Sequence, residues 1–292
     1  MSKPFLKWAG GKTQMLTHIR EYIPTELNSD INTYVEPFVG GGAVLFWILR
    51  NFSNVKNVII NDINTDLTTT YIIIRDNTNE LISQLKILQK KYFTFSLDER
   101  KNYYLEIRQK FNERNNNPVI QSAYFIFLNK TCYNGLYRVN KKNEFNVPFG
   151  KYKNPKICDE KILLTNSQNL KNVIILNDDF EKTFNYIEGK SFFYFDPPYR
   201  PLNQTSSFNT YTTDGFDDMS QTRLSGFCDN LHDENHLWLL SNSDPKNYNP
   251  DDNFFDELYS KYSIVRVNAK RSINSDGSKR GNIKELLIRN YS

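Results

Sequence analysis

A short apolar run that stops at two consecutive prolines is the strongest constraint on how this chain of 292 residues can fold. Phe192–Phe195 is typical of a buried strand, and Asp-Pro-Pro-Tyr follows it directly at residues 196–199. Proline has no N–H for a strand ladder, and it disfavours a helical conformation in the residue before it. The backbone must therefore leave the sheet in a rigid, extended turn, which holds a carboxylate, a carbonyl and an aromatic ring at the end of the strand.

The groups in this turn can bind a planar amine. The carboxylate of Asp196 and the carbonyl of Pro197 can accept its two N–H bonds, while the ring of Tyr199 stacks on the ring that carries the amine. An enzyme that methylates the exocyclic amino group of a base needs such groups, so we predict that Asp196, Pro197, Pro198 and Tyr199 form a catalytic segment. The alternative is an ordinary strand followed by a proline-rich loop, and these four residues alone do not decide between the two.

A glycine-rich loop near the N-terminus indicates a second binding element. A strand pattern comes first, three glycines follow at residues 40–42, and a helix pattern comes next. Gly40 and Gly42 let the backbone pass close to a ligand at the N-terminus of that helix. A dinucleotide fingerprint also needs a small residue after the glycines, but Val44 and Leu45 stand there, which argues against a pyrophosphate cofactor.

The following strand pattern ends at Asp62, and an acid at such a place can hold both hydroxyls of a ribose. A glycine loop and a ribose acid without a phosphate site favour S-adenosylmethionine as the ligand. The alternative for either element alone is structural, namely a turn for the glycines and a helix cap for Asp62. The combination favours binding, because both elements precede a strand that ends in Asp-Pro-Pro-Tyr.

The remaining patterns predict an α/β fold that a helical segment interrupts. Strand patterns occupy residues 33–37, 57–61, 173–176, 191–195, 237–240, 264–267 and 285–289. Helical patterns occupy residues 43–50, 65–75, 80–91, 97–114 and 119–131, and residues 136–139 and 144–147 are typical of a β-hairpin. We therefore predict a Rossmann-like sheet domain from residues 1–77 and 171–292, with residues 78–170 as an inserted, mainly helical domain.

Composition excludes several classes of protein. The net charge of +4 permits a polyanion as partner without requiring one, and three scattered cysteines fit neither a disulfide framework nor a zinc site. The three histidines lack the spacing of metal ligands, so we expect no metal. The chain shows no signal-peptide pattern and no apolar run long enough to cross a membrane, which favours the cytoplasm and argues against a membrane partner. We expect no obligatory protein partner, and a monomer or weak dimer.

Several short motifs occur in one order along nearly the whole chain. They are Phe5–Lys12, Glu36–Gly42, Asn61–Asp62, Tyr133–Arg138, Glu144–Gly150, Asp179–Phe180 and Asp196–Tyr199, with Lys270–Ile273 as a tail. Together they resemble the Dam-type DNA adenine-N6 methyltransferases, in particular the enzymes that modify GATC sites. The resemblance implies S-adenosyl-L-methionine as cofactor, double-stranded DNA as partner, base flipping and methyl transfer to adenine N6. It also suggests a role in restriction-modification, which the sequence does not distinguish from that of a phage or orphan enzyme.

The resemblance further implies roles for single residues. The implied cofactor site consists of Trp8, Lys12, Phe38, Asp62, Asp179, Phe180 and Asp196, with Gly40 and Gly42 in its loop. Phe38 and Phe180 would flank the adenine of the cofactor, and Asp179 would lie near its amino group. The implied DNA contacts are Lys7, Tyr133, Asn134, Leu136, Arg138, Pro148, Lys270 and Arg271. Arg138, on the hairpin of the implied target-recognition domain, is expected to read guanine, and Lys7 to read the outer guanine.

Three other functions remain open at this point. The same reaction could act at a different adenine-containing site, or on RNA, although no RNA-binding module is recognisable in the sequence. A DNA-binding relative without catalysis is disfavoured by the intact Asp-Pro-Pro-Tyr turn. Residues 200–218 follow that turn, and we expect them to be mobile without DNA and to close over a flipped base.

Overall fold

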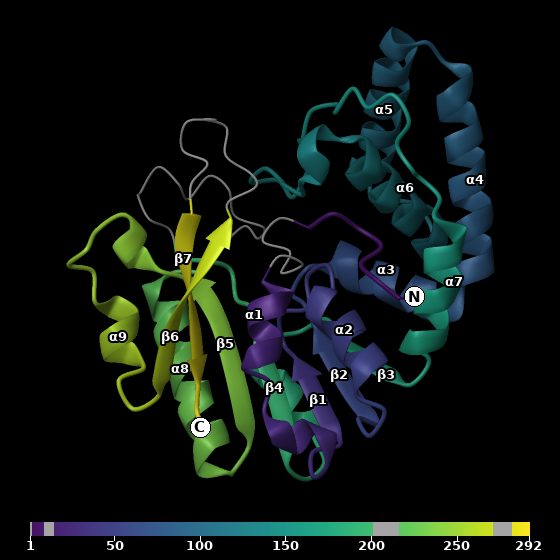
Figure 1. Ribbon diagram of the computed structural model, residues 1–292. Coiled ribbons are helices and arrows are strands. Elements are labelled where there is room, and N and C mark those ends of the chain that lie inside the picture. The colour runs from purple at the N-terminus through teal and green to yellow at the C-terminus, as the bar shows by residue number, and fades with distance from the viewer. Residues whose placement is uncertain (1, 9–14, 201–215, 271–281) are drawn as a thin grey trace.

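The strand order of the central sheet determines where a ligand can bind. The computed structural model describes residues 2–8, 15–200, 216–270 and 282–292, and within them one seven-stranded sheet has the order β3-β2-β1-β4-β5-β7-β6 (Figure 1). The strands are β1 (Thr33–Glu36), β2 (Asn57–Asn61), β3 (Val173–Leu176), β4 (Ser191–Phe195), β5 (Leu237–Ser243), β6 (Ser263–Lys270) and β7 (Asn282–Arg289). Strands β1 to β5 pair in parallel, whereas β7 is antiparallel to both β5 and β6. The predicted α/β sheet is thereby confirmed.

The carboxyl ends of β1 and β4 lie side by side at the point where the chain order changes direction across the sheet. Strand β1 pairs with β2 on one side and with β4 on the other, and Val35 stands opposite Phe193. Ligands of open parallel sheets bind beyond the carboxyl ends of the strands at such a switch point. The glycine loop after β1 and the Asp-Pro-Pro-Tyr turn after β4 therefore leave the sheet as neighbours.

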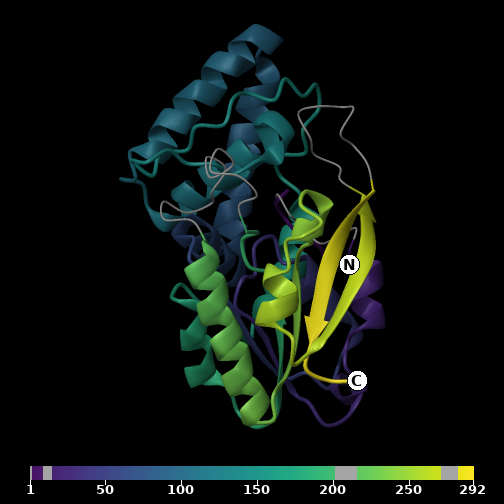
Figure 2. The ribbon, with the colours of Figure 1, turned by 90° about the vertical axis from the view of Figure 1, so that its left-hand side faces the viewer.

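Helices cover the sheet and also form a group beyond it. The described helices are α1 (Leu16–Glu21), α2 (Ala43–Asn51), α3 (Thr65–Asp76), α4 (Thr78–Thr94), α5 (Leu97–Asn112), α6 (Pro118–Thr131), α7 (Glu160–Leu170), α8 (Asp218–Asp233) and α9 (Phe254–Leu258). Helix α6 packs against α3, α4 and α5, and α4, α5 and α6 lie at the upper end of the molecule in Figures 1 and 2. The helices predicted in α2 to α6 are confirmed.

Four described helices, α1, α7, α8 and α9, were not predicted from the sequence pattern. Helix α8 shows the physical reason. Its buried side includes Gln221 and Ser225 together with Leu224, Cys228 and Leu231, so polar residues interrupt the apolar stripe. Gln221 donates to the Pro198 carbonyl and Ser225 to the Leu258 carbonyl. The periodicity of the sequence cannot show such partners.

One hydrophobic core connects the sheet with the helices between β2 and β3. Buried side chains of the sheet, such as Tyr34 and Ile60, belong to the same cluster as Tyr92 of α4 and Phe127 of α6. The opposite face of the sheet carries a second cluster, which includes Trp238 of β5. The helical segment therefore shares its core with the sheet in the described part of the chain.

The predicted hairpin reverses direction as expected, but its two regular strands are absent from the described structure. A single bridge joins Val139 and Phe145, and the Asn140 N–H donates to the Glu144 carbonyl at 2.9 Å. The side chain of Asn112, at the end of α5, accepts from the Phe145 N–H at 2.8 Å and donates to the Phe145 carbonyl at 3.1 Å. The prediction of two regular strands was wrong, because the pairing is limited to this one bridge and the outward-facing backbone groups of Phe145 bond to Asn112. We call residues 134–150 the hairpin below.

Candidate active site at the carboxyl edge of the sheet

The glycine loop after β1 is shaped by close contacts that only glycine permits. Gly42 has a φ of +71°, and a Cβ atom there would lie 2.4 Å from the hydroxyl of Tyr71. Gly40 has a φ of +48°, and its Cβ would lie 3.0 Å from the indole of Trp8. The Tyr71 hydroxyl donates to the Gly40 carbonyl at 3.0 Å. The backbone of the loop is therefore held between Tyr71, which was not predicted from the sequence, and Trp8, which was assigned to the same site as the loop.

Asp62 contacts this loop from the end of β2. One carboxylate oxygen accepts from the Gly40 N–H at 3.0 Å, and the other accepts from the Asn64 N–H at 3.0 Å. Burial raises the pKa of Asp62 to about 6, although these two backbone hydrogen bonds act in the opposite direction. A carboxylate can accept more than two hydrogen bonds, so Asp62 can still receive the hydroxyls of a ribose. The loop and the acid fit S-adenosylmethionine in this respect.

The Asp-Pro-Pro-Tyr turn is held by side chains from β5 and β7. The hydroxyl of Ser241, on β5, lies 3.3 Å from a carboxylate oxygen of Asp196 and 2.9 Å from the hydroxyl of Tyr194. The Tyr199 hydroxyl donates to the carboxylate of Glu285, on β7, at 3.0 Å. These contacts hold the acid and the aromatic ring in place before any base arrives, which is what a catalytic turn requires.

The two prolines of the turn have different surroundings. The Pro198 carbonyl accepts from the amide of Gln221, on α8, at 3.2 Å. Pro197 is buried, and within the described residues no donor contacts its carbonyl. Arg200, the next residue after the turn, forms ion pairs with Asp218 and Asp252. The turn is therefore anchored on both sides of the carbonyl that was predicted to accept an amine.

Glu36 is an acid of this site that the sequence analysis missed. Its side chain is buried at the end of β1, and it accepts from the Tyr34 hydroxyl at 2.8 Å. Burial raises the pKa of Glu36 well above its ordinary value, and the charges of Asp196 and Asp62 raise it further. Three acids therefore lie near one another at the switch point. The feature of the sequence that could have indicated Glu36 is its position at the end of a strand pattern, just before the glycine loop.

An aromatic corner lies beside the glycine loop. The rings of Phe38 and Phe180 have centroids 5.4 Å apart, so they contact each other in the free protein, with no room for a third ring between them. The guanidinium of Arg223, on α8, lies 4.4 Å from the Phe180 ring centroid and pairs with Asp179 at 2.5 Å. Phe216 also contacts Phe38 and Phe180, with ring centroids 5.6 and 6.3 Å away. Neither Arg223 nor Phe216 carries a motif from which the sequence could predict this placement.

The residues predicted to contact DNA gather around the start of the hairpin. Lys7 is exposed, and the Asn129 side chain bonds its backbone N–H at 2.9 Å, its carbonyl at 2.7 Å and the Gly135 carbonyl at 3.0 Å. The guanidinium of Arg138 donates to the Asn146 side chain at 2.7 Å. Tyr133, Asn134 and Pro148 are exposed, and Leu136 is half-buried. The structure thus brings Lys7 next to the hairpin, although the two are far apart in the sequence.

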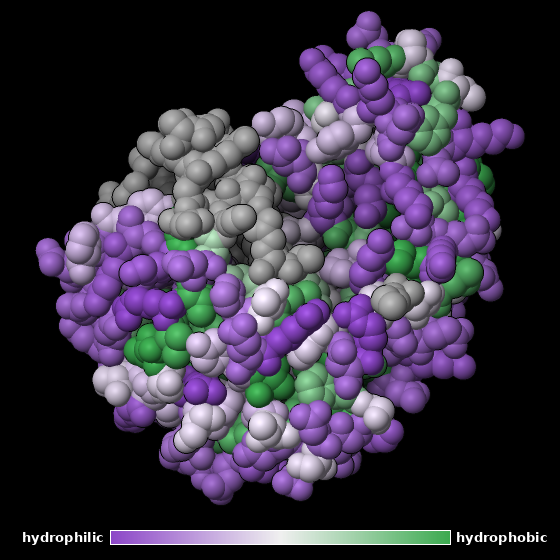
Figure 3. Space-filling model, in the orientation of Figure 1, coloured by the Kyte–Doolittle hydropathy of each residue, from purple (hydrophilic) through white to green (hydrophobic). Residues whose placement is uncertain are grey.

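Some predicted residues cannot be placed. Lys12, Arg271 and residues 201–215 of the expected closing segment lie outside the described residues, as does the side chain of Lys270. Among the described residues, no group of three or more His, Cys, Asp or Glu side chains could hold a metal ion. No described helix is long and apolar enough to span a membrane. Figure 3 shows mainly hydrophilic side chains over the face that it presents, with small hydrophobic patches between them.

Comparison with known proteins identifies close relatives. Residues 8–273 match a family model described as D12 class N6 adenine-specific DNA methyltransferase. The type II methyltransferase M.MjaIII of Methanocaldococcus jannaschii is 52% identical over 293 residues, which cover 99% of each chain. The type II methyltransferase M1.LlaDCHI of Lactococcus lactis is 36% identical, over 99% of this chain and 95% of that one. A DNA adenine methylase of Escherichia coli is 32% identical, over 98% and 94% of the two chains.

Proposed function

This chain belongs to the D12 class of N6 adenine-specific DNA methyltransferases, and we propose that it methylates adenine N6 within GATC sites of double-stranded DNA. The observation that carries the proposal is the position of Asp196. It leaves the sheet beside the glycine loop and is hydrogen-bonded to Ser241. An acid fixed there can receive an amino group next to the cofactor loop.

We propose S-adenosyl-L-methionine as the methyl donor. When bound, this cofactor supplies a methyl group that its sulfonium has already activated. Asp62 would hold the ribose, and the backbone at Gly40 and Gly42 would lie along the ligand. The remaining proposed contacts are Trp8, Lys12, Phe38, Asp179, Phe180 and Asp196. Because the rings of Phe38 and Phe180 already touch, at least one ring must rotate to admit an adenine between them.

The chain's own groups would make adenine N6 a better nucleophile. The nitrogen lone pair is delocalised into the ring, so the amine is weakly nucleophilic. Asp196 and the Pro197 carbonyl would accept both N–H bonds, which favours a pyramidal nitrogen with a directed lone pair. These bonds strengthen as the nitrogen gains positive charge, so they stabilise the transition state more than the bound base. Removal of the base from the duplex costs a few kcal/mol. Tyr199 would stack on the base once it is outside the duplex.

We propose residues 78–170 as the target-recognition domain inserted into a catalytic domain of residues 1–77 and 171–292. The hairpin supports this proposal. Its Arg138 is oriented by Asn146, and Asn129 holds the backbone of Lys7 beside it. Arginine can bond guanine O6 and N7 together. The proposed DNA contacts are Lys7, Tyr133, Asn134, Leu136, Arg138, Pro148, Lys270 and Arg271. The names of two relatives, both type II methyltransferases, also support a place in a type II restriction-modification system. We propose that the enzyme acts in the cytoplasm.

The test is methylation of a plasmid by the purified protein and by Asp196→Ala. Wild-type protein should protect the plasmid from a nuclease that cuts only unmethylated GATC and expose it to one that cuts only methylated GATC. Asp196→Ala should lower incorporation of labelled methyl groups at least about a thousandfold, because it removes an acceptor used in the transition state.

Asp233→Ala is the matched control, because it removes an exposed aspartate at the end of α8, at the edge of the sheet opposite the turn. Undiminished incorporation by Asp196→Ala would refute the catalytic assignment. Methylated adenine at another sequence would refute the GATC assignment alone, and methyl transfer only to RNA would refute the DNA substrate.

A further inference from the structure

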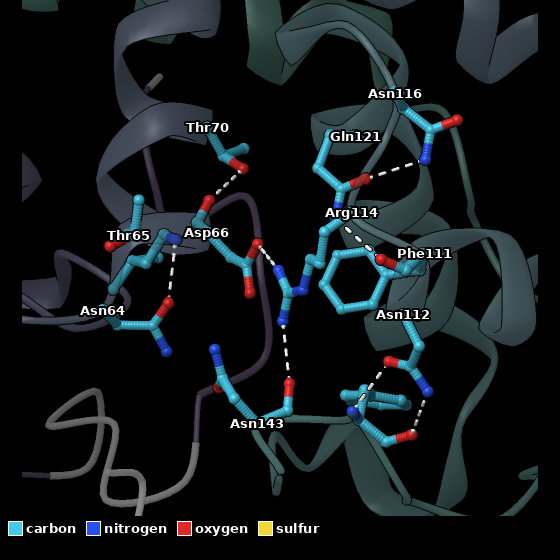
Figure 4. Close-up of polar contacts among 12 residues, drawn as sticks. Asn64, Thr65, Asp66, Thr70, Phe111, Asn112, Arg114, Asn116, Gln121 and Asn143 are labelled. Carbon is cyan, nitrogen blue, oxygen red and sulfur yellow. Dashed lines mark hydrogen bonds and ion pairs between the residues drawn. The ribbon is translucent and has the colours of Figure 1, made fainter. Parts of the chain in front are cut away.

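A polar bridge joins the first turn of α3, which follows Asp62 in the sequence, to the hairpin (Figure 4). Asp66 lies in the first turn of α3, and its side chain is only 10% exposed. Its carboxylate forms an ion pair with Arg114, which Figure 4 shows. It also accepts from the Tyr137 hydroxyl at 3.1 Å. Arg114 follows the end of α5, whereas Tyr137 belongs to the hairpin. One acid thus contacts two segments of the proposed target-recognition domain.

Arg114 extends this bridge to the turn of the hairpin. Its guanidinium donates to the carbonyl of Asn143 at 3.2 Å and lies 4.5 Å from the ring centroid of Phe111. Asn112, two residues earlier, holds both backbone groups of Phe145. Figure 4 shows Asp66 and Asn143 converging on Arg114 from two sides. The hairpin is therefore held from the end of α5, and Arg114 is the charged link.

The other end of the bridge is the turn that holds the proposed ribose acid. The Asn64 N–H donates to Asp62, and the Asn64 side chain caps α3 by accepting from the Leu67 N–H at 3.0 Å. Asn64 therefore connects the two acids, because Asp62 precedes this cap and Asp66 follows it in the first turn of α3. Acidic side chains are also favoured in the first turn of a helix, where Asp66 lies.

A second contact connects the same two regions through stacked rings. The ring of Tyr137 stacks on the indole of Trp8, with centroids 5.4 Å apart and planes inclined by 21°. That indole covers Gly40 and Gly41 of the glycine loop. The ring of Tyr137 therefore contacts the proposed cofactor site. Its hydroxyl contacts Asp66, in the first turn of the helix that follows Asp62.

We propose that Asp66, Arg114 and Tyr137 are positioning residues that couple cofactor binding to DNA recognition by the hairpin. This inference rests on the proposed function. A ribose bound at Asp62 restricts the turn that carries Asp66, and the bridge transmits that restriction to the hairpin. Coupling of two binding equilibria is reciprocal, so DNA must tighten cofactor binding by the same factor by which the cofactor tightens DNA binding.

The test compares Asp66→Asn with Asp76→Asn. Both substitutions remove the charge of an ion-paired aspartate on α3, but Asp76 pairs with Arg75 at the opposite end of that helix. Calorimetry would measure the affinity for S-adenosylhomocysteine with and without a GATC duplex. In wild-type protein and Asp76→Asn we expect the duplex to tighten binding by about fivefold or more. In Asp66→Asn we expect that ratio to fall close to one.

Tyr137→Phe keeps the stacked ring and loses only the hydroxyl, so it tests the same bridge if Asp66→Asn does not fold. Amide hydrogen exchange gives an independent readout, because S-adenosylhomocysteine alone should slow exchange in residues 140–146 of wild-type protein but not of Tyr137→Phe. A wild-type ratio of one, or unchanged ratios in both variants, would overturn the inference. Absence of S-adenosylhomocysteine binding to wild-type protein would instead overturn the proposed function, and this inference with it.

Discussion

The acids of the site differ because their surroundings differ. Asp62 accepts two backbone N–H groups at the edge of the sheet, whereas Glu36 is buried beneath the glycine loop with a tyrosine hydroxyl as donor. Asp196 lies beyond β4, where a serine hydroxyl approaches its carboxylate. Burial raises the pKa of Glu36 well above its ordinary value and that of Asp62 to about 6. Similar side chains at one edge of a sheet can thus serve binding, packing and catalysis.

The pKa of Asp62 predicts how ligand affinity depends on pH. Ribose hydroxyls donate to an ionised carboxylate, so binding favours the charged form of Asp62. As the pH falls through about 6, the free protein takes up a proton that binding must release, and affinity decreases by about tenfold per pH unit. Above pH 7 affinity should be nearly constant. Titration with S-adenosylhomocysteine from pH 5 to 8 would measure this, and an Asp62→Asn variant should bind weakly without that dependence. A pH profile shared by both proteins would contradict the role of Asp62.

Ser241 provides a second prediction at the scale of single residues. Its hydroxyl lies between Tyr194 and Asp196 and is fully buried, so Ser241→Ala removes a contact that orients the carboxylate that we propose to be catalytic. We expect kcat to fall about tenfold, which corresponds to about 1.4 kcal/mol, while the affinity for S-adenosylhomocysteine changes little. Single-turnover methylation and calorimetry would separate the two effects. A kcat within twofold of wild type would show that Asp196 is oriented without Ser241.

At the scale of elements, the sequence predicted strands well where a short apolar run has clear ends. The bounds predicted for β3 and β4 agree with the structure, because polar residues or prolines stop each run. The hairpin strands failed because their pairing is limited to the bridge between Val139 and Phe145, and Asn112, at the end of α5, bonds the outward-facing backbone groups of Phe145. The pairing of Arg223 with Asp179 was equally inaccessible, since 44 positions separate the two residues. Local pattern fixes an element, whereas partners distant in the chain become visible only in the fold.

The hairpin supports a prediction that separates base contacts from phosphate contacts. Arg138 is half-buried and is oriented by Asn146 before DNA binds, whereas Lys142 is exposed at the turn. Arg138→Ala should reduce discrimination between GATC and a site with one altered base pair by about 1–3 kcal/mol. Lys142→Ala should weaken binding to both duplexes equally and reduce the slope of log affinity against log salt by about one. Binding assays at several salt concentrations would measure both effects, and equal losses on the two duplexes by both variants would refute the hairpin assignment.

At the scale of the whole molecule, the shared core bears on the proposed division into two domains. Residues 78–170 are continuous in sequence, and α4, α5 and α6 stand together at one end of the molecule (Figure 2). Their buried side chains nevertheless belong to the same cluster as those of β1 and β2. The apolar face of this segment is buried against the sheet domain, so unfolding of the sheet would expose that face to water and destabilise the segment. Two functional regions can thus form one cooperative unit of stability.

This shared core predicts a single unfolding transition. The variant Trp8→Phe leaves Trp47, on α2, and Trp238, on β5, so tryptophan fluorescence then reports on the sheet and the helix beside it. Far-ultraviolet circular dichroism also reports on α4, α5 and α6, because they are long helices. If the core unfolds as one unit, the two signals must give the same midpoint and slope in urea. A circular dichroism transition at lower urea than the fluorescence transition would show that residues 78–170 unfold first. The shared core would then consist of two parts that unfold separately. Substitution of Phe127 by Leu should shift both signals together, by about 1 kcal/mol or more, because this buried ring contacts Tyr92 and Tyr103 within the common cluster.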